Sequence, residues 1–236
     1  MISGNTKTIK NIVGKICLIA LVMNSCNKDN SDTNTPPNII IPDQSFSQSF
    51  ESKVAAETQG WKFINLSDDR GKDWSFISSG PGPMTSAQNG TNFLYSDYEA
   101  STDVTGDISN WAISPKIVIQ NGDKISFYAR SNGSVDGYGD RLQLRMNIFN
   151  TSDSIGEAST DVGNFTRPLL DINPLLRTDN VSFPSTWTKY EATISGLNKP
   201  DSGRVAIRYF LVIANGANGD AVGVDNFVYQ SVNGSK

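Results

Sequence analysis

A period-two alternation of apolar and polar residues constrains the fold of this chain more than any other feature. In Arg141–Ile148 the apolar residues are Leu142, Leu144, Met146 and Ile148, and the intervening ones are Arg141, Gln143, Arg145 and Asn147. Successive side chains of a strand point to opposite faces. This spacing therefore predicts a strand whose apolar set faces the core and whose polar set faces solvent.

Four further segments show strand patterns. Lys124–Arg130 and Trp187–Ile194 are rich in strand-forming residues, and Val222–Tyr229 closes the pattern near the C-terminus. Arg204–Ile213 is apolar on both faces late in its run, which predicts a strand in the middle of a sheet.

Turn residues separate these runs, with Asn-Gly pairs in Gln120–Asp123 and Ser131–Ser134. No segment has a convincing helical periodicity, and only a brief helical turn is expected, around Leu169–Leu176. Many short strands joined by Gly and Asn turns predict an all-β sandwich or barrel of about ten to twelve strands.

The residue types that are absent exclude several chemistries. The chain has no histidine, which removes Ser-His-Asp catalysis, histidine-ligated zinc and a histidine pH switch. Its 24 acidic residues outnumber the 20 basic ones, and no basic cluster stands out. Nucleic-acid binding depends on Lys and Arg at phosphates, so we expect no nucleic-acid partner.

The N-terminus has the pattern of an export signal. Three lysines up to Lys15 precede the apolar run Ile16–Met23, and Cys26 follows. The run is too short to span a membrane, which takes about 20 residues, and it fits a signal peptide. The residues before Cys26 resemble a loose lipobox. We therefore predict a signal peptide over 1–25 and a lipid on Cys26; an ordinary signal peptide with an incidental cysteine is the alternative.

Residues 26–45 are polar and contain proline, which predicts a flexible tether ahead of a domain at 46–232. Lys28-Asp29 resembles the short export tag of surface lipoproteins. We therefore expect an outer-membrane lipoprotein, attached to the membrane by its lipid and exposed on the cell surface. A periplasm-facing anchor is the alternative. Without a second cysteine after the signal peptide, the domain has no disulfide and no thiolate metal site.

Seven strings, in order, resemble the choice-of-anchor J and cleaved-adhesin families. The first, Asn110–Pro115, resembles the DWLISP element of those families. The others are Gly139–Arg145, Val162–Thr166, Leu169–Pro174, Phe183–Thr188, Ser202–Tyr209 and Val222–Asn226. The resemblance implies a jelly-roll β-sandwich of cell-surface and secreted proteins without catalytic activity. Related domains are linked with host-protein binding, haem binding and structural calcium.

The resemblance also implies a structural calcium site joining the first strand to the last. The matching residues are Glu51 and Asp225, and Asp97 could add a third carboxylate. Calcium takes six to eight oxygen ligands, carboxylates among them. An acid such as Asp225 within an apolar strand is costly to bury unless it is paired or metal-bound. A salt bridge or a capped turn would also account for it.

Exposed aromatic side chains could form a ligand platform. Tyr138, in the loop Asp136–Asp140, and Trp74 are the predicted ligand-binding residues. Core or edge packing is the competing interpretation for both, because buried aromatics are common. Trp111 and Tyr209 lie in strongly patterned strands and are expected in the core.

Together these features predict a non-enzymatic, surface-tethered adhesion or ligand-binding module, expected to be a monomer, with an extracellular protein or glycan as ligand. A glycan-binding accessory lipoprotein of a polysaccharide-uptake system is the alternative, and a purely structural spacer is a third reading. Glycoside hydrolysis would need two converging carboxylates, and the five scattered Glu residues give no such signature.

Overall fold

The computed structural model describes residues 41–103, 105–133, 137–212 and 219–233. The chain divides into two units, Met1–Ile39 and Ile40–Lys236, and the described residues all belong to the second. The predicted signal peptide, Cys26 and most of the predicted tether lie outside the described residues. No helix in the described ranges is long and apolar enough to cross a membrane.

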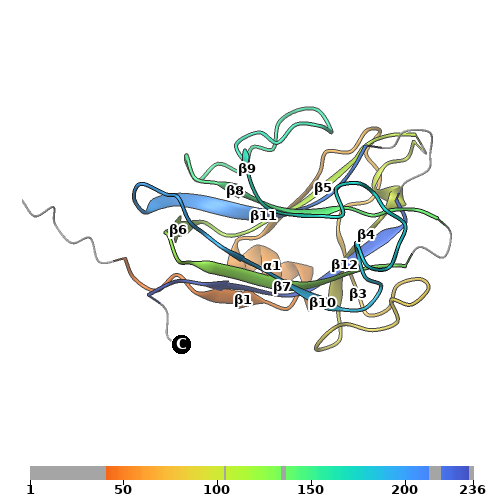
Figure 1. Cartoon of the computed structure of the whole chain (residues 1–236), viewed down its shortest axis with the longest axis horizontal. Helices are drawn as coiled ribbons and strands as arrows, with labels where there is room; N and C mark the ends of the chain where they lie inside the picture. Colours follow the sequence, from red (N-terminus) through yellow and green to blue (C-terminus); the bar gives the residue numbers. More distant parts are fainter. Residues whose placement is uncertain (1–40, 104, 134–136, 213–218, 234–236) are drawn as a thin grey trace, which may run out of the picture. The chain divides into compact units, whose positions relative to one another are not determined.

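Two antiparallel sheets pack face to face and form a jelly-roll sandwich (Figure 1). The first sheet has the order β10-β7-β12-β4-β3, and β1 pairs with β12. Its strands are β1 (Phe46–Gln48), β3 (Ser75–Ile77), β4 (Phe93–Asp97), β7 (Lys124–Ser131), β10 (Thr188–Thr193) and β12 (Ala221–Gln230). The predicted all-β sandwich is therefore confirmed, with twelve strands among the described residues.

The second sheet has the order β2-β5-β11-β8-β9, and β6 pairs with β11. Its strands are β2 (Lys62–Asn65), β5 (Ile108–Ile113), β6 (Ile117–Ile119), β8 (Leu142–Asn147), β9 (Arg167–Ile172) and β11 (Asp201–Leu211). β11 lies between β5 and β8. The prediction of a central strand from its two apolar faces is thus confirmed.

The core between the sheets is made by the predicted inward residues. Ile125, Phe127 and Ala129 of β7 are fully buried, as are Leu142 and Leu144 of β8. They belong to one hydrophobic cluster contributed by both sheets. Each fully buried large apolar side chain contributes about 1.5–3 kcal/mol, so alternation along each strand is what stabilises the sandwich.

The predicted outward face of β8 is wrong for three of its four residues. Gln143, Arg145 and Asn147 are buried, because the segment 148–166 covers the outer side of the second sheet (Figure 1). Arg145 donates from Nε to the Phe165 carbonyl at 2.8 Å. A second apolar cluster joins that segment to the sheet, and its members are Leu66, Trp111, Ile113, Ile155, Phe165 and Ala206.

Two local elements also differ from expectation. A helix, α1 (Lys53–Gln59), forms between Ser52, whose side chain caps its N-terminus, and Gly60, which ends it at a φ of 106°. Its seven residues bury only Ala56, too short a run for a visible helical period. The helical turn expected around Leu169–Leu176 is wrong for the first half of that segment, because residues up to Ile172 belong to strand β9 and pairing with β8 keeps them extended. A turn follows, in which the Leu176 N–H donates to the Asn173 carbonyl at 3.1 Å.

The last residues of the predicted tether lie against the domain. Ile41 is buried, and its carbonyl accepts a hydrogen bond from the Asn233 side chain at 3.1 Å. The Ser45 hydroxyl accepts one from the Ser231 N–H at 2.9 Å. The chain therefore joins the sandwich a few residues before β1.

Candidate functional site

The outer side of the first sheet is only partly covered. The segment 78–92, between β3 and β4, folds over one part of it and encloses a small apolar cluster of Met84, Phe93, Tyr95 and Ala221. Trp187 packs edge-on against Phe93 at a ring separation of 5.4 Å. Its indole N–H donates to the Ser86 carbonyl at 3.1 Å, which holds the segment on the sheet.

A groove opens where this segment ends. Its volume is about 490 Å³, and it crosses β10, β7 and β12 on the side away from the core. The described residues that line it are Gln88, Asn89, Ser126, Tyr128, Lys189, Asn226 and Val228. Six of the seven carry a polar group, and none is a carboxylate. The volume lies in the range of about 300–1,000 Å³ that is typical of small-molecule sites.

Strand register aligns the floor of the groove in a row. Tyr128 of β7 pairs with Lys189 of β10 on one side and with Asp225 of β12 on the other. Directly paired residues share one face of a sheet, so these three side chains lie side by side. Ser126, paired with Val228, forms the next row. The floor therefore belongs to rigid strands and not to loops.

Asp225 ties the rim of the groove to its floor. Its carboxylate is buried and accepts backbone N–H bonds from Gln88 at 2.9 Å, Asn89 at 3.1 Å and Asn226 at 2.7 Å. Burial raises the pKa of Asp225, the three N–H bonds act in the opposite direction, and the charge of Glu51 adds to the rise. These hydrogen bonds offset the cost of burying the carboxylate, and they fix the rim segment in place.

Glu51 holds the same segment further along. Its carboxylate accepts from the N–H of Thr91 at 3.1 Å and from that of Asn92 at 3.0 Å. Gly90 adopts a φ of +76°, and a Cβ there would lie 1.9 Å from Glu51 Oε1. The positive φ favours glycine at this position, and any larger residue would also have to displace the Glu51 carboxylate. Glu51 and Asp225 thus form a two-carboxylate clamp on residues 88–92.

The strand at the end of the groove is bulged. The register of β12 against β7 shifts between Asp225 and Val228, and Asn226 has a φ of +48°. The Asn226 amide donates to the side-chain carbonyl of Gln88. Bulges and left-handed residues other than glycine concentrate near functional sites, where they re-aim side chains. The bulge turns the Asn226 amide into the groove lining.

The three predicted calcium ligands fall into two places. Asp97 pairs with Ala221, four residues along β12 from Asp225, roughly 13 Å at the rise of a strand. It accepts from the Tyr95 hydroxyl at 3.1 Å and from the Glu99 N–H at 3.0 Å. In the described ranges no group of three His, Cys, Asp or Glu residues could hold a metal ion. Glu51 and Asp225 instead face N–H donors, so the described residues do not fit a preformed calcium site, and calcium binding stays a prediction.

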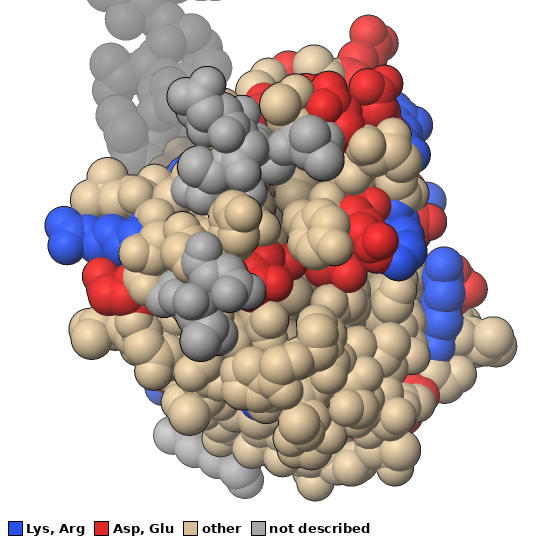
Figure 2. All heavy atoms as spheres, turned by 90° about the vertical axis from the view of Figure 1, so that its right-hand side faces the viewer, with Lys and Arg blue, Asp and Glu red and all other residues tan. Residues whose placement is uncertain are grey.

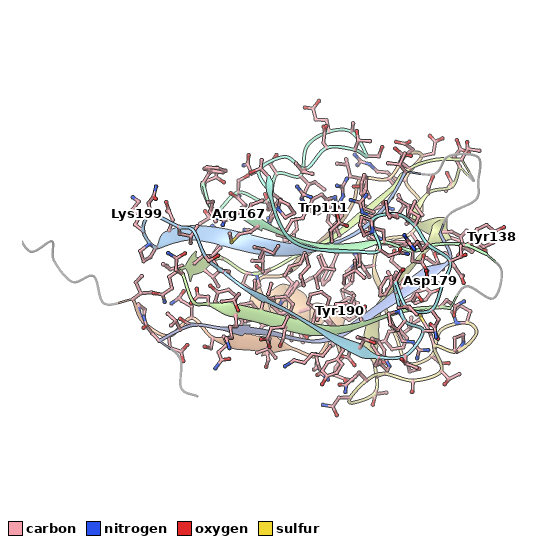
Figure 3. The ribbon with its side chains drawn as sticks, in the orientation of Figure 1. Trp111, Tyr138, Arg167, Asp179, Tyr190 and Lys199 are labelled. Carbon is pink, nitrogen blue, oxygen red and sulfur yellow. The ribbon has the colours of Figure 1, made fainter. Side chains whose placement is uncertain are left out.

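The prediction of an exposed aromatic is wrong for Trp74, and ligand binding by Tyr138 stays a prediction. Trp74 is only 2% exposed, because it packs into the core between the sheets, and it cannot contact a ligand. Tyr138 is 40% exposed and lies at one end of the sandwich together with Asp179 (Figure 3). Trp111 and Tyr209 are fully buried, as expected.

Carboxylates gather at the end of the sandwich that carries Tyr138 (Figure 2). Asp140, two residues along the chain from Tyr138, is buried and accepts from the Tyr209 hydroxyl at 2.7 Å and from the Asp220 N–H at 2.9 Å. Burial raises the pKa of Asp140 to about 7, although both bonds act in the opposite direction. The Asp220 side chain accepts from the Asn132 amide at 2.8 Å. This network ties β11 and β12 to the loop that carries Asp140.

Sequence reasoning did not single out the groove residues. Tyr128 and Ser126 occupy outward positions of a correctly predicted strand, but the pattern treats all outward positions alike. What distinguishes these two is that segment 78–92 stops short of them. No local sequence signal shows where such a segment ends.

Comparison with known proteins supports the fold. The Cleaved Adhesin Domain family model matches residues 44–142. No curated protein matches the chain. A cleaved adhesin domain of Lys-gingipain from Porphyromonas gingivalis has a TM-score of 0.50 at 14% identity, over 80% of this chain and 100% of that domain. A second such domain of Lys-gingipain has a TM-score of 0.51 at 16% identity, over 79% and 99%. At these identities the likeness concerns the fold alone.

Proposed function

We propose that this protein is a lipid-anchored, non-catalytic module that binds an extracellular ligand through the groove on β7, β10 and β12. The observation that carries the proposal is the groove itself. Its floor is a row of strand residues, and its rim is held by the clamp of Glu51 and Asp225. A site fixed before ligand arrives loses less entropy on binding.

The proposed location rests on the N-terminal pattern and on the comparisons. Lys15, Ile16–Met23 and Cys26 have the order of a lipoprotein signal. The family model that matches residues 44–142 is that of an adhesin domain. A domain attached through Cys26 to the outer membrane would present its groove to partners outside the cell. An adhesion or ligand-binding role follows from that placement.

The absence of catalysis is proposed from the chemistry of the groove. Lys189 is the one charged residue among its described lining residues. Hydrolysis of a glycosidic bond needs an acid and a second carboxylate on opposite sides of the bond. The Asp225 carboxylate already accepts three N–H bonds beneath the rim, and the exposed Glu191, which pairs with Ser126 across the strands, is ion-paired with Lys189 at 3.5 Å. Binding without turnover is the chemistry that these groups support.

The anchor is tested with Cys26→Ala and intact cells. We expect the full chain to incorporate labelled fatty acid and to be degraded by added protease on intact cells. The variant should lose the label. Labelled chain that resists protease until the outer membrane is opened would place the anchor on the periplasmic face. Absence of label from the full chain would contradict the lipid.

Ligand binding is tested with the purified full chain on immobilised extracellular proteins and polysaccharides. We expect saturable binding that Tyr128→Ala abolishes and Tyr98→Ala leaves unchanged. Tyr98 is the matched control, because it is 56% exposed and does not line the groove. If both variants keep saturable binding, the groove is not the binding site. If the full chain binds none of the immobilised proteins or polysaccharides, the proposed ligand-binding role is wrong.

A further inference from the structure

We infer that the groove binds a neutral glycan, an inference that rests on the proposed function. It adds the class of ligand and the residues that would recognise it. The inference comes from three properties of the lining: the kind of hydrogen-bonding groups, the position of the one aromatic ring, and the balance of charge.

The hydrogen-bonding groups suit a ligand rich in hydroxyls. Gln88, Asn89 and Asn226 contribute amides, and Ser126 contributes a hydroxyl. Amide and hydroxyl groups both donate and accept, as sugar hydroxyls do. The amides of Gln88 and Asn226 also bond to each other, which fixes the orientation of both. A peptide ligand would instead favour an unpaired strand edge or apolar pockets. β7 and β12 are interior strands, and the edge strand β10 contributes only the side chain of Lys189, on its face, to the groove.

One aromatic ring lies in the floor. Tyr128 is half-buried between Lys189 on β10 and the bulge of β12. An aromatic ring offers a flat apolar surface with a polar tip, which matches the alternation of C–H faces and hydroxyl edges on a pyranose. Val228 continues the apolar strip beyond Ser126. A sugar ring stacked on Tyr128 would therefore reach the amides of the rim.

The charge balance favours a neutral sugar over an acidic one. Lys189 is paired with Glu191, two residues along the same strand, at 3.5 Å. Behind the rim stand the carboxylates of Asp225 and Glu51. Glu191, which pairs with Ser126 across the strands, adds a third carboxylate beside the floor. Of the described cations, Lys189, which Glu191 screens, and Arg130, whose guanidinium lies over the Trp187 ring at 5.6 Å, lie on the same face. An anionic glycan would therefore meet more carboxylates than cations. A neutral chain meets no such repulsion.

The test measures binding of the full chain by calorimetry to a panel of soluble glycans. Neutral members are oligosaccharides of glucose, xylose, galactose and mannose in α and β linkages, and the acidic member is oligogalacturonate. We expect at least one neutral member to bind and oligogalacturonate not to. Tyr128→Ala should weaken binding at least tenfold, Tyr128→Phe less than threefold, and Tyr98→Ala not at all. A thermal melt of each variant confirms that it is folded.

Three outcomes would overturn the inference: no neutral member binds, only oligogalacturonate binds, or folded Tyr128→Ala binds as tightly as the unaltered chain. The proposed function fails separately. If an immobilised extracellular protein is bound and Tyr128→Ala abolishes that binding, the groove is a ligand site and only the glycan is wrong. If neither proteins nor polysaccharides bind, the proposed function itself is wrong.

Discussion

Asp140 makes the stability of this protein depend on pH in an unusual direction. Its pKa is raised to about 7 in the folded protein, first by burial, whereas an exposed aspartate in the unfolded chain titrates near about 3.9. Between these values the folded state keeps a proton that the unfolded state has lost. The folded state then binds more protons, so the free energy of unfolding falls as pH rises from about 4 to about 7.

The size of the effect follows from the shift. At about 1.36 kcal/mol for each pKa unit, a rise of about three units removes at most about 4 kcal/mol between pH 4 and pH 7. Asp140→Asn keeps the shape and an oxygen that can accept from Tyr209 and from the Asp220 N–H. We expect the variant to match the unaltered chain near pH 4 and to exceed its stability at pH 8.

The assay is urea unfolding of both proteins at pH 4, 5, 6, 7 and 8. Asp97 and Asp225 also have raised pKa values and are common to both proteins, so the difference between the two curves isolates Asp140. Asp179→Asn is the control of opposite sign: hydrogen bonds from Ser182 lower the pKa of that exposed acid, so its removal should destabilise above pH 4. Parallel curves for the unaltered chain and Asp140→Asn would refute the reasoning.

Three further predictions concern the clamp on the groove. Asp225→Ala should destabilise the protein by about 2–4 kcal/mol in urea, because three N–H groups lose their buried acceptor, and an effect below about 1 kcal/mol would contradict the clamp. Gly90→Ala should lower the free energy of unfolding by about 1–3 kcal/mol. Gly137→Ala is the control and should cost less, because Gly137 has a similar φ but no atom within 4 Å of where a Cβ would lie. Equal effects would show that the contact with Glu51 adds no cost at Gly90. Calcium at 100-fold excess over its Kd should raise stability by about 2.7 kcal/mol relative to EDTA if the predicted site exists, and should do so less in Asp225→Ala. Identical melting curves in calcium and in EDTA would show that the predicted calcium site does not exist.

Much of the fold could be predicted from the sequence, because the alternation that decides which strand residues are buried is a local pattern. Alternation identified the inward residues of β7 and β8, and the two apolar faces of Arg204–Ile213 identified the central strand. Asn-Gly turns marked the ends of strands, since they allow backbone angles that other residues avoid. These are local properties, and each can be read from a few neighbouring residues.

The candidate site was only partly predictable. Glu51 and Asp225 were predicted as calcium ligands, and Asp225 also as an acid that needs a partner when buried; in the structure both accept N–H bonds. Apart from the neighbouring Asn226 N–H at Asp225, their partners are N–H groups within residues 88–92, which no sequence spacing connects to either acid. Trp74 was misjudged, because a tryptophan just before a short strand can point inward or outward with equal ease.

The sequence by itself determined the alternating strands, the sandwich they can form, the missing chemistries and the pattern of an exported chain. Only the tertiary structure decided which outward faces remain open. Segment 148–166 covers Gln143, Arg145 and Asn147, whereas segment 78–92 stops before Tyr128. The physical reason is that a strand specifies two faces through its own period, but the cover on its outer face comes from residues distant in the chain. Their reach is set by contacts such as the Glu51 and Asp225 clamp, which exist only after the sheets have assembled.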